Sequence, residues 1–100
     1  LLPEAVATAN LPTVHATTRA WAFVKFVLQD ASLAAEALAA IAANPVETER
    51  ASMLTGILDS IDDQHIPAVS AILASVPTAT FREPLLGALK KRFPGVLWFP

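Results

Sequence analysis

The chain has 100 residues, of which 54% are hydrophobic and 16% are charged, and its formal net charge is −2. This length fits one domain with a single core, and so few charges exclude the basic face of an electrostatic nucleic-acid binder. The absence of cysteine excludes disulfides and thiolate metal sites. The longest apolar run, residues 20–28, is interrupted by Lys25 and is shorter than the roughly 18 residues of a membrane span.

Proline residues divide the chain into segments of helical length, because proline is tolerated in the first turn of a helix and not in its interior. Glycine is scarce, and no Asn-Gly or Asp-Gly pair indicates a β-hairpin. The sequence therefore predicts an all-α fold of five to six short helices, paired as antiparallel αα-hairpins in a solenoid-like or compact bundle. We expect one helical domain over residues 1–100, with a helical core at 13–93 and an apolar C-terminal tail at 94–100. The predicted helices cover residues 3–10, 13–29, 31–43, 46–61, 65–75 and 80–92.

The predicted helix at 13–29 is apolar almost all round, which is typical of a central helix that is covered on several sides. We expect Trp21, Val24 and Leu28 to lie in the core, and Phe23 or Phe26 to face a partner instead. The β-branched and aromatic content of this segment leaves a strand open as an alternative.

Two predicted helices begin at residues that can cap them. Asp30 or Ser32 can accept a backbone N–H bond at the start of the helix at 31–43. Asn44 can do the same for the following helix, where Pro45 fits the first position and Glu47 completes a box-like arrangement.

The last predicted helix contains a conflict at its start. Thr80 with Glu83 would form a capping box, but Pro84 then falls just inside the helix. The helix therefore starts nearer Glu83 or has a strained first turn. At the other end, the basic run at residues 90–92 complements the helix dipole, an interpretation that we prefer to a role in binding nucleic acid.

Two stretches of the sequence, about 32 residues apart, are nearly copies of each other. Residues 37–50 are echoed by residues 69–82, with Arg50 and Arg82 in register, and a weaker copy reaches Arg19. The positions that recur are turn and capping residues and the apolar stripes beside them. One helical hairpin cannot bury its apolar face alone, whereas stacked hairpins can, so the repetition predicts a scaffold and not a catalytic pocket.

A longer set of residues follows this repetition: Pro45-Val46-x-x-x-Arg50, Met53-Leu54-x-x-Ile57-Leu58, Asp62-Asp63, Ile66-Pro67-Ala68-Val69, Pro77, Arg82 and Leu85-Leu86-x-x-Leu89. Together they resemble HEAT-type helical repeats, especially the short variety, over about residues 31–93. The resemblance implies a scaffold for protein–protein contacts, in which loop acids pair with helix arginines along the stack. By that analogy Asp62 or Asp63 would face Arg82, and Asp30 would face Arg50.

Three further segments, at residues 21–25, 36–41 and 72–77, are similar, in order, to parts of the alanine-rich peridinin–chlorophyll antenna proteins of algae. This second resemblance implies a helical carrier of a pigment or another apolar ligand. The region of Trp21, Phe23 and Phe26 would then form the wall of an apolar cavity. The histidines of the chain do not stand at the matching positions.

Groups with reactive chemistry are few. His15 and His65 lie in different segments without a set of metal ligands, and we expect each to make local hydrogen bonds where a helix starts. The acids at residues 59–63 lack the spacing of a calcium loop, so solvation or pairing with Arg82 explains them better. No nucleophile elbow and no phosphate-binding loop occurs. We therefore predict no catalytic, metal-binding or cofactor-binding residue.

The carboxyl tail is the strongest binding candidate in the sequence. After a helix stop, Leu97, Trp98 and Phe99 form a continuous apolar run. Folded back, the run would cap the last hairpin, whereas left free it would expose a patch of the kind that marks partner sites. Both interpretations stay open, and the predicted partner-binding residues are Leu97, Trp98 and Phe99 together with Phe23 and Phe26.

These features predict a non-enzymatic protein–protein interaction module, which is a small structural subunit or a domain of a larger assembly. It would bind a protein partner or a second copy of itself, but no nucleic acid and no cofactor. The alternatives are a helical carrier of an apolar ligand or pigment, and the helical tail domain of a larger enzyme. The chain begins with Leu1 and not with methionine, which indicates a processed chain or a fragment.

Overall fold

The computed structural model describes residues 2–11 and 15–98. Within these ranges the fold is all-α, without a strand, and this confirms the predicted fold class of five to six short helices. Short 3₁₀ turns at Ala31–Leu33 (η1), Leu58–Ser60 (η2) and Asp63–His65 (η3) join some of the α-helices. The α-helices are α1 (Leu2–Ala9), α2 (Ala16–Gln29), α3 (Ala34–Ala43), α4 (Glu47–Gly56), α5 (Ile66–Ala74) and α6 (Ala79–Arg92).

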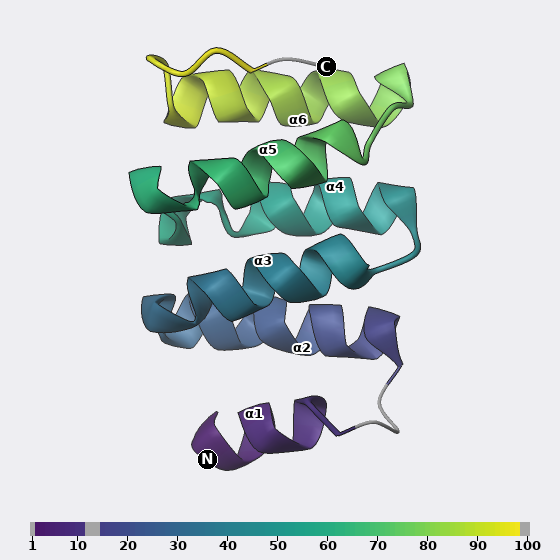
Figure 1. The fold of residues 1–100 in the computed structure, drawn as a ribbon, viewed down its shortest axis with the longest axis vertical. Helices are drawn as coiled ribbons and strands as arrows, with labels where there is room; N and C mark the ends of the chain where they lie inside the picture. The colour runs from purple at the N-terminus through teal and green to yellow at the C-terminus, as the bar shows by residue number, and fades with distance from the viewer. Residues whose placement is uncertain (1, 12–14, 99–100) are drawn as a thin grey trace.

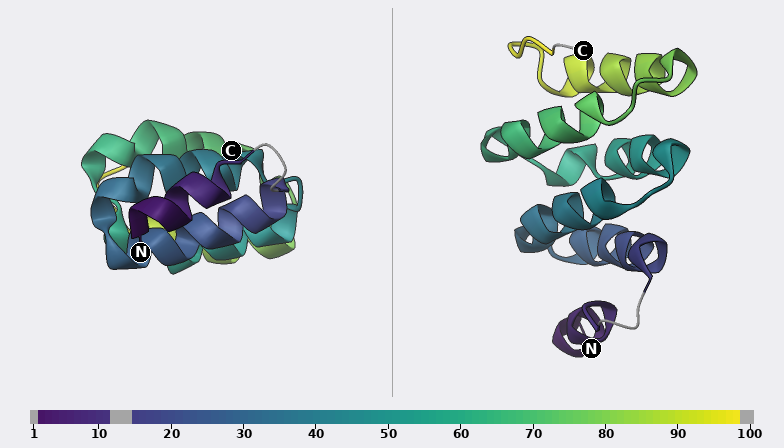
Figure 2. Two further views of the ribbon diagram at one scale, coloured as in Figure 1. Left: turned by 90° about the horizontal axis from the view of Figure 1, so that it is seen from below. Right: turned by 45° about the vertical axis from the view of Figure 1, so that its right-hand side comes forward.

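The helices are stacked one above another in chain order, and each runs opposite to the one before it (Figure 1). Helix α3 contacts α5, and α4 contacts both α2 and α6, so that odd and even helices form two layers. The stack measures 37 × 24 × 17 Å and is elongated along the direction in which the helices follow one another (Figures 1 and 2). Helix α1 lies at one end of the stack, and residues 94–98 of the carboxyl tail run back over α6 at the other end.

Buried apolar side chains form one cluster that extends along the stack. Fully burying a valine, leucine, isoleucine, phenylalanine or methionine side chain stabilises a fold by roughly 1.5–3 kcal/mol relative to leaving it exposed. Small side chains also matter, because buried alanines on facing sides of α2 and α3 let these two helices pack closely. The largest fully buried residues include Phe23, Leu38, Ile41, Met53, Leu54, Ile57, Ile61, Ile72, Leu73, Leu85 and Leu89.

The predicted orientation of α2 is wrong in part. The segment is a helix, so the strand alternative is excluded, and Val24 is buried as expected. Trp21 and Leu28, however, are 42% and 62% exposed and do not belong to the core. Helix α2 packs against α1, η1, α3 and α4, and these neighbours leave Trp21 and Leu28 uncovered. Its buried face consists of Ala20, Phe23, Val24 and Val27.

The start of the third predicted helix is a 3₁₀ turn. Asp30 caps it, because its Oδ1 accepts hydrogen bonds from the Ser32 N–H at 3.0 Å and from the Ser32 hydroxyl at 2.7 Å. These bonds hold the pKa of the Asp30 carboxyl below its usual value. The predicted cap at Asp30 is therefore confirmed, while regular α-helix begins only at Ala34.

Helix α4 is shorter than predicted and starts differently. Its N-cap is Val46, whose N–H donates to the side chain of Asn44. The expected box with Glu47 does not form, since the Glu47 carboxylate binds Thr78 instead. The helix ends at Gly56 and not near residue 61, which fits the poor helix propensity of glycine.

Pro84 lies inside α6, as the sequence conflict indicated. The helix nevertheless begins early, at Ala79, with Thr78 as an N-cap that makes no side-chain capping bond, so the predicted box of Thr80 with Glu83 does not form. Proline removes one intrahelical hydrogen bond to the carbonyl four residues earlier, which is that of Thr80. Both Thr80 and Pro84 are exposed, so water can satisfy this carbonyl.

Candidate functional site

The arginines of the chain hold helix ends together. Arg19, Arg50 and Arg82 each occupy the fourth residue of an even helix: α2, α4 and α6, respectively. Each guanidinium donates to main-chain carbonyl oxygens near the end of the preceding helix, which a helix leaves without an internal partner. The acceptors are the carbonyls of Ala9 and Leu11 for Arg19, of Asn44 for Arg50, and of Leu73 and Val76 for Arg82.

Arg50 and a fourth arginine, Arg92, join elements that are far apart in the sequence. Arg50 donates to the hydroxyl and to the carbonyl of Ser75, at 3.0 and 2.6 Å, and so links the start of α4 to the end of α5. Arg92 donates to the carbonyls of Leu58 and Ile61, at 3.1 and 2.7 Å, and so links the end of α6 to η2. The basic run at residues 90–92 thus contributes Arg92 to the fold.

The acid–arginine pairs implied by the HEAT resemblance do not form. Asp30 binds Ser32, and Arg50 binds carbonyl and hydroxyl oxygens. Asp62 caps the turn that it begins, because its Oδ1 accepts from the N–H of Gln64. In this stack, main-chain carbonyls take the place that the resemblance gives to loop acids.

The buried polar side chain of Asn44 is fully engaged. It is 1% exposed, and its Oδ1 accepts from the N–H of Val46 at 3.1 Å. Its Nδ2 donates to Glu49 Oε1 at 3.1 Å, and the main-chain carbonyl of Asn44 accepts from Arg50 at 2.7 Å. Because each polar group of Asn44 is satisfied, the residue fixes the α3–α4 turn and offers no free donor to a ligand.

The two histidines lie where helical segments start. His65 completes a capping box, since its Nδ1 accepts from the N–H of Asp62, and this confirms the predicted local hydrogen bond. His15 precedes α2, and its carbonyl accepts from the N–H of Arg19. Across residues 2–11 and 15–98, no three His, Asp or Glu side chains come together as metal ligands would.

None of the helices in the described part of the chain has both the length and the apolar character needed to cross a membrane.

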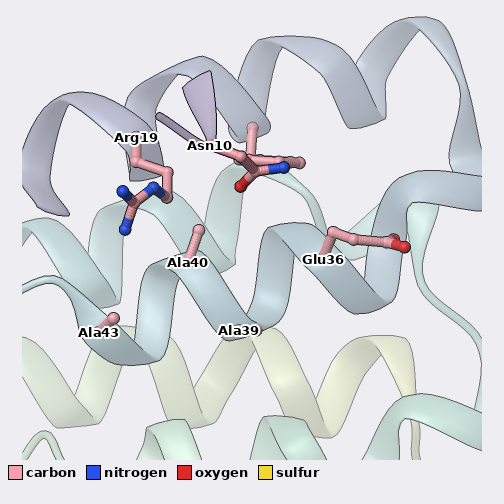
Figure 3. Close-up of a pocket in the computed structure, with 7 residues that line it drawn as sticks. Asn10, Arg19, Glu36, Ala39, Ala40 and Ala43 are labelled. Atoms are coloured by element: carbon pink, nitrogen blue, oxygen red, sulfur yellow. The ribbon is translucent and has the colours of Figure 1, made fainter. Parts of the chain in front are cut away.

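The surface hollows of the molecule are open and small. One of about 250 Å³ lies between the end of α1 and helices α2 and α3. Figure 3 shows Arg19 and Glu36 toward opposite ends of its alanine-lined floor, so they do not converge on one point. Another hollow of about 390 Å³ lies between α4 and α6 and is lined by side chains such as Thr48, Thr80 and Phe81. The first hollow keeps its two charged side chains apart, and the second is lined by no charged side chain.

The predicted partner-binding residues fall at two separate places in the stack. Phe23 is 2% exposed and packs edge-on against Phe26, with ring centroids 5.4 Å apart. Phe23 therefore belongs to the core and is not available to a partner, while Phe26 is half-buried beside it. The tail lies at the opposite end, beyond α6 (Figure 1).

Within the tail, neighbouring residues differ sharply. Trp98 packs against the core, with its ring 6.2 Å from that of Phe93, and its indole N–H is buried without a hydrogen-bond partner among the described residues. Leu97 is 80% exposed. Phe99 lies outside the described residues. The contact of Trp98 corresponds to the capping interpretation of the tail.

One surface feature, which we call the α2 stripe, was not predicted from the sequence and consists of Trp21, Lys25 and Leu28. Residues four and seven apart share one face of a helix, and all three side chains are exposed. Lys25 makes no hydrogen bond and no ion pair with the described residues. The spacing was visible in the sequence, but the surrounding apolar residues concealed which face of α2 would be buried.

The α2 stripe therefore places a tryptophan and a leucine in solvent, one turn on either side of an unpaired lysine. Trp and Leu side chains of this exposure are more costly to leave in water than to cover with another surface. No family model, no curated protein and no solved structure matches this chain.

Proposed function

We propose that the chain is a non-enzymatic protein–protein interaction module, a small subunit or a domain of a larger assembly, and that the α2 stripe is its contact surface. The observation that carries the proposal is the position of Trp21, which is 42% exposed on a stack that buries its core without it. Tryptophan is among the residues that dominate binding energy at protein interfaces.

The architecture supports the same function. The arginine at the fourth residue of α2, α4 and α6, with its carbonyl partners in the preceding helix end, recurs as a repeat unit would. A HEAT-like scaffold of this kind exposes the outer faces of its helices to partners, and its stability comes from contacts between neighbouring units.

The arrangement of polar groups also favours binding over catalysis. The arginines, the buried Asn44 and the capping residues are all engaged in holding helix ends. An apolar carrier is less well supported, because Trp21 lies outside while Phe23 lies in the core, so the two do not face a common cavity.

Native purification of the tagged chain tests the proposal. The wild type should retain a partner protein, and the double variant Trp21→Ser/Leu28→Ser should lose it while keeping its helical circular dichroism. The matched control is Leu97→Ser, which removes an apolar side chain that is more exposed than either Trp21 or Leu28, far from the α2 stripe, and should keep the partner.

Two results would contradict the proposal. Retention of the partner by the double variant would show that the α2 stripe is not the contact surface. A wild-type chain that purifies alone, as a monomer, under conditions that preserve native complexes would contradict the interaction module altogether.

A further inference from the structure

The α2 stripe has a defined spacing. Trp21 and Leu28 are seven residues apart on one helix, so their positions along the axis differ by about 10.5 Å. Lys25 lies between them on the same face. A surface that covers both apolar side chains must therefore also meet one ammonium group.

Lys25 is a cation without a hydrogen-bond or ion-pair partner among the described residues. The four arginines each bind carbonyl oxygens, and the other two lysines, Lys90 and Lys91, lie in the last turn of α6, where they complement the helix dipole. Lys25 sits in the middle of α2, and the positions three and four residues away are Trp21, Ala22, Leu28 and Gln29, none of them acidic.

Building on the proposed function, we infer that the α2 stripe binds an amphipathic helix of another protein. That helix carries two apolar side chains seven residues apart and an aspartate or glutamate between them. Its carboxylate meets the ammonium group of Lys25, while its apolar side chains pack on Trp21 and Leu28.

The spacing selects a helix over an extended strand. In a helix, residues seven apart share a face and are separated by about 10.5 Å, which matches the stripe. In a strand, residues on one face are separated by about 6.7 or 13.3 Å, and both distances match the stripe less well than the helical spacing does.

Charge disfavours a second copy of this chain, bound symmetrically through the α2 stripe, as the occupant. Lys25 lies near the midpoint between Trp21 and Leu28, so a two-fold axis through the stripe brings the two Lys25 ammonium groups together. Like charges at an interface disfavour association, whereas a carboxylate at the same place favours it. An anionic lipid surface is the weaker candidate, because one lysine on a chain with net charge −2 attracts it little.

A display selection with the intact chain as bait tests the inference. The library is an alanine-rich helical peptide of about 18 residues, long enough to form a helix, with the positions of one face randomised. Selected peptides should carry apolar residues seven apart with Asp or Glu between them. Trp21→Ala should weaken their binding at least about tenfold.

Charge reversal makes the test specific. Selection against Lys25→Glu should enrich Lys or Arg at the central position, whereas the matched control Lys91→Glu, on α6, should again select an acid. Three results would overturn the inference. The selected peptides could lack the acid, or their central residue could keep the same charge when Lys25 is changed to Glu. The selection could also yield no peptide whose binding depends on Trp21. Binding of the chain to phosphatidylserine–phosphatidylcholine vesicles that is lost in Lys25→Glu would overturn it in favour of a membrane.

The inference and the proposed function can fail separately. When no acidic helix is selected but the Trp21→Ser/Leu28→Ser variant still loses its native partner, the partner class is wrong and the interaction module stands. When the native partner is also retained by that variant, both are wrong.

Discussion

Among the single residues, the arginines stabilise the stack by donating hydrogen bonds to main-chain carbonyls near helix ends. A guanidinium has five donors in a fixed fork, so one side chain can satisfy two carbonyls at a helix end. Arg50 illustrates this, because it bonds the carbonyls of both Asn44 and Ser75 and the hydroxyl of Ser75. Removing it leaves carbonyls in a half-buried region without their donors.

We expect Arg50→Ala to lower the free energy of unfolding by about 2–4 kcal/mol, since charged hydrogen bonds contribute roughly 1.5–3 kcal/mol each and are not additive. Arg50→Lys should recover only a small part, because an ammonium group cannot reproduce the fork. Urea unfolding measures the change, with Lys90→Ala as an exposed control. Equal stability of Arg50→Ala and the control would contradict the proposed role.

The positions of these arginines could be predicted from the sequence, but their partners could not. Arg50 and Arg82 recur in register, which marks them as structural. Their partners are main-chain carbonyls, and a carbonyl has no sequence signature. The HEAT resemblance implies the acids Asp30 and Asp62 as partners, whereas each of them caps its own turn.

At the scale of elements, the carboxylate of Glu47 joins the start of α4 to the start of α6. It accepts from the N–H and from the hydroxyl of Thr78, both at 2.8 Å. These two hydrogen bonds lower the pKa of Glu47 from its usual 4.5, the backbone bond having the larger effect. A group with a lowered folded-state pKa stabilises the fold above its unfolded-state pKa and loses that contribution as the pH falls through the folded-state value.

The unfolding free energy should therefore fall as the pH is lowered below about 4.5. Glu47→Gln should flatten this dependence, and the residual slope should come in part from Asp30, whose pKa is also lowered. Thermal unfolding at a series of pH values measures both chains. The control is Glu83→Gln, which changes an exposed acid on α6 and should leave the slope unchanged. A Glu47→Gln chain as pH-sensitive as wild type would rule out a stabilising contact between Glu47 and Thr78.

For the carboxyl tail, the sequence left open whether it caps the last hairpin or docks to a partner. Trp98 packs against Phe93 and the core, while Leu97 points to solvent. Trp98→Ala should lower the free energy of unfolding by about 1–2 kcal/mol through lost apolar and ring contact. Leu97→Ala should change it by less than about 0.5 kcal/mol.

The same pair of variants separates capping from docking. Unfolding measured beside partner binding should show lower stability and intact binding for Trp98→Ala. Unchanged stability with loss of the partner would instead make the tail a docking segment.

At the scale of the whole molecule, the number and order of helices followed from local signals. Proline positions and apolar periods mark where helices can start and how long they run, and both act within a few residues. The buried face of α2 could not be predicted from the sequence, because a helix that is apolar all round has no preferred buried side until its neighbours are known. Trp21 and Leu28 were assigned to the core for this reason, and they became exposed because α1, α3 and α4 cover only part of α2.

Fluorescence quenching measures how exposed Trp21 is and whether a partner covers it. Trp98→Phe leaves Trp21 as the sole tryptophan, and Trp21→Phe leaves Trp98 as the matched reporter. Acrylamide should quench Trp21 more strongly than Trp98 in the isolated chain, and binding of the native partner should protect Trp21 and not Trp98. A shielded Trp21 in the isolated chain, or a Trp21 that stays accessible in the complex, would contradict the claim that the α2 stripe is reserved for a partner.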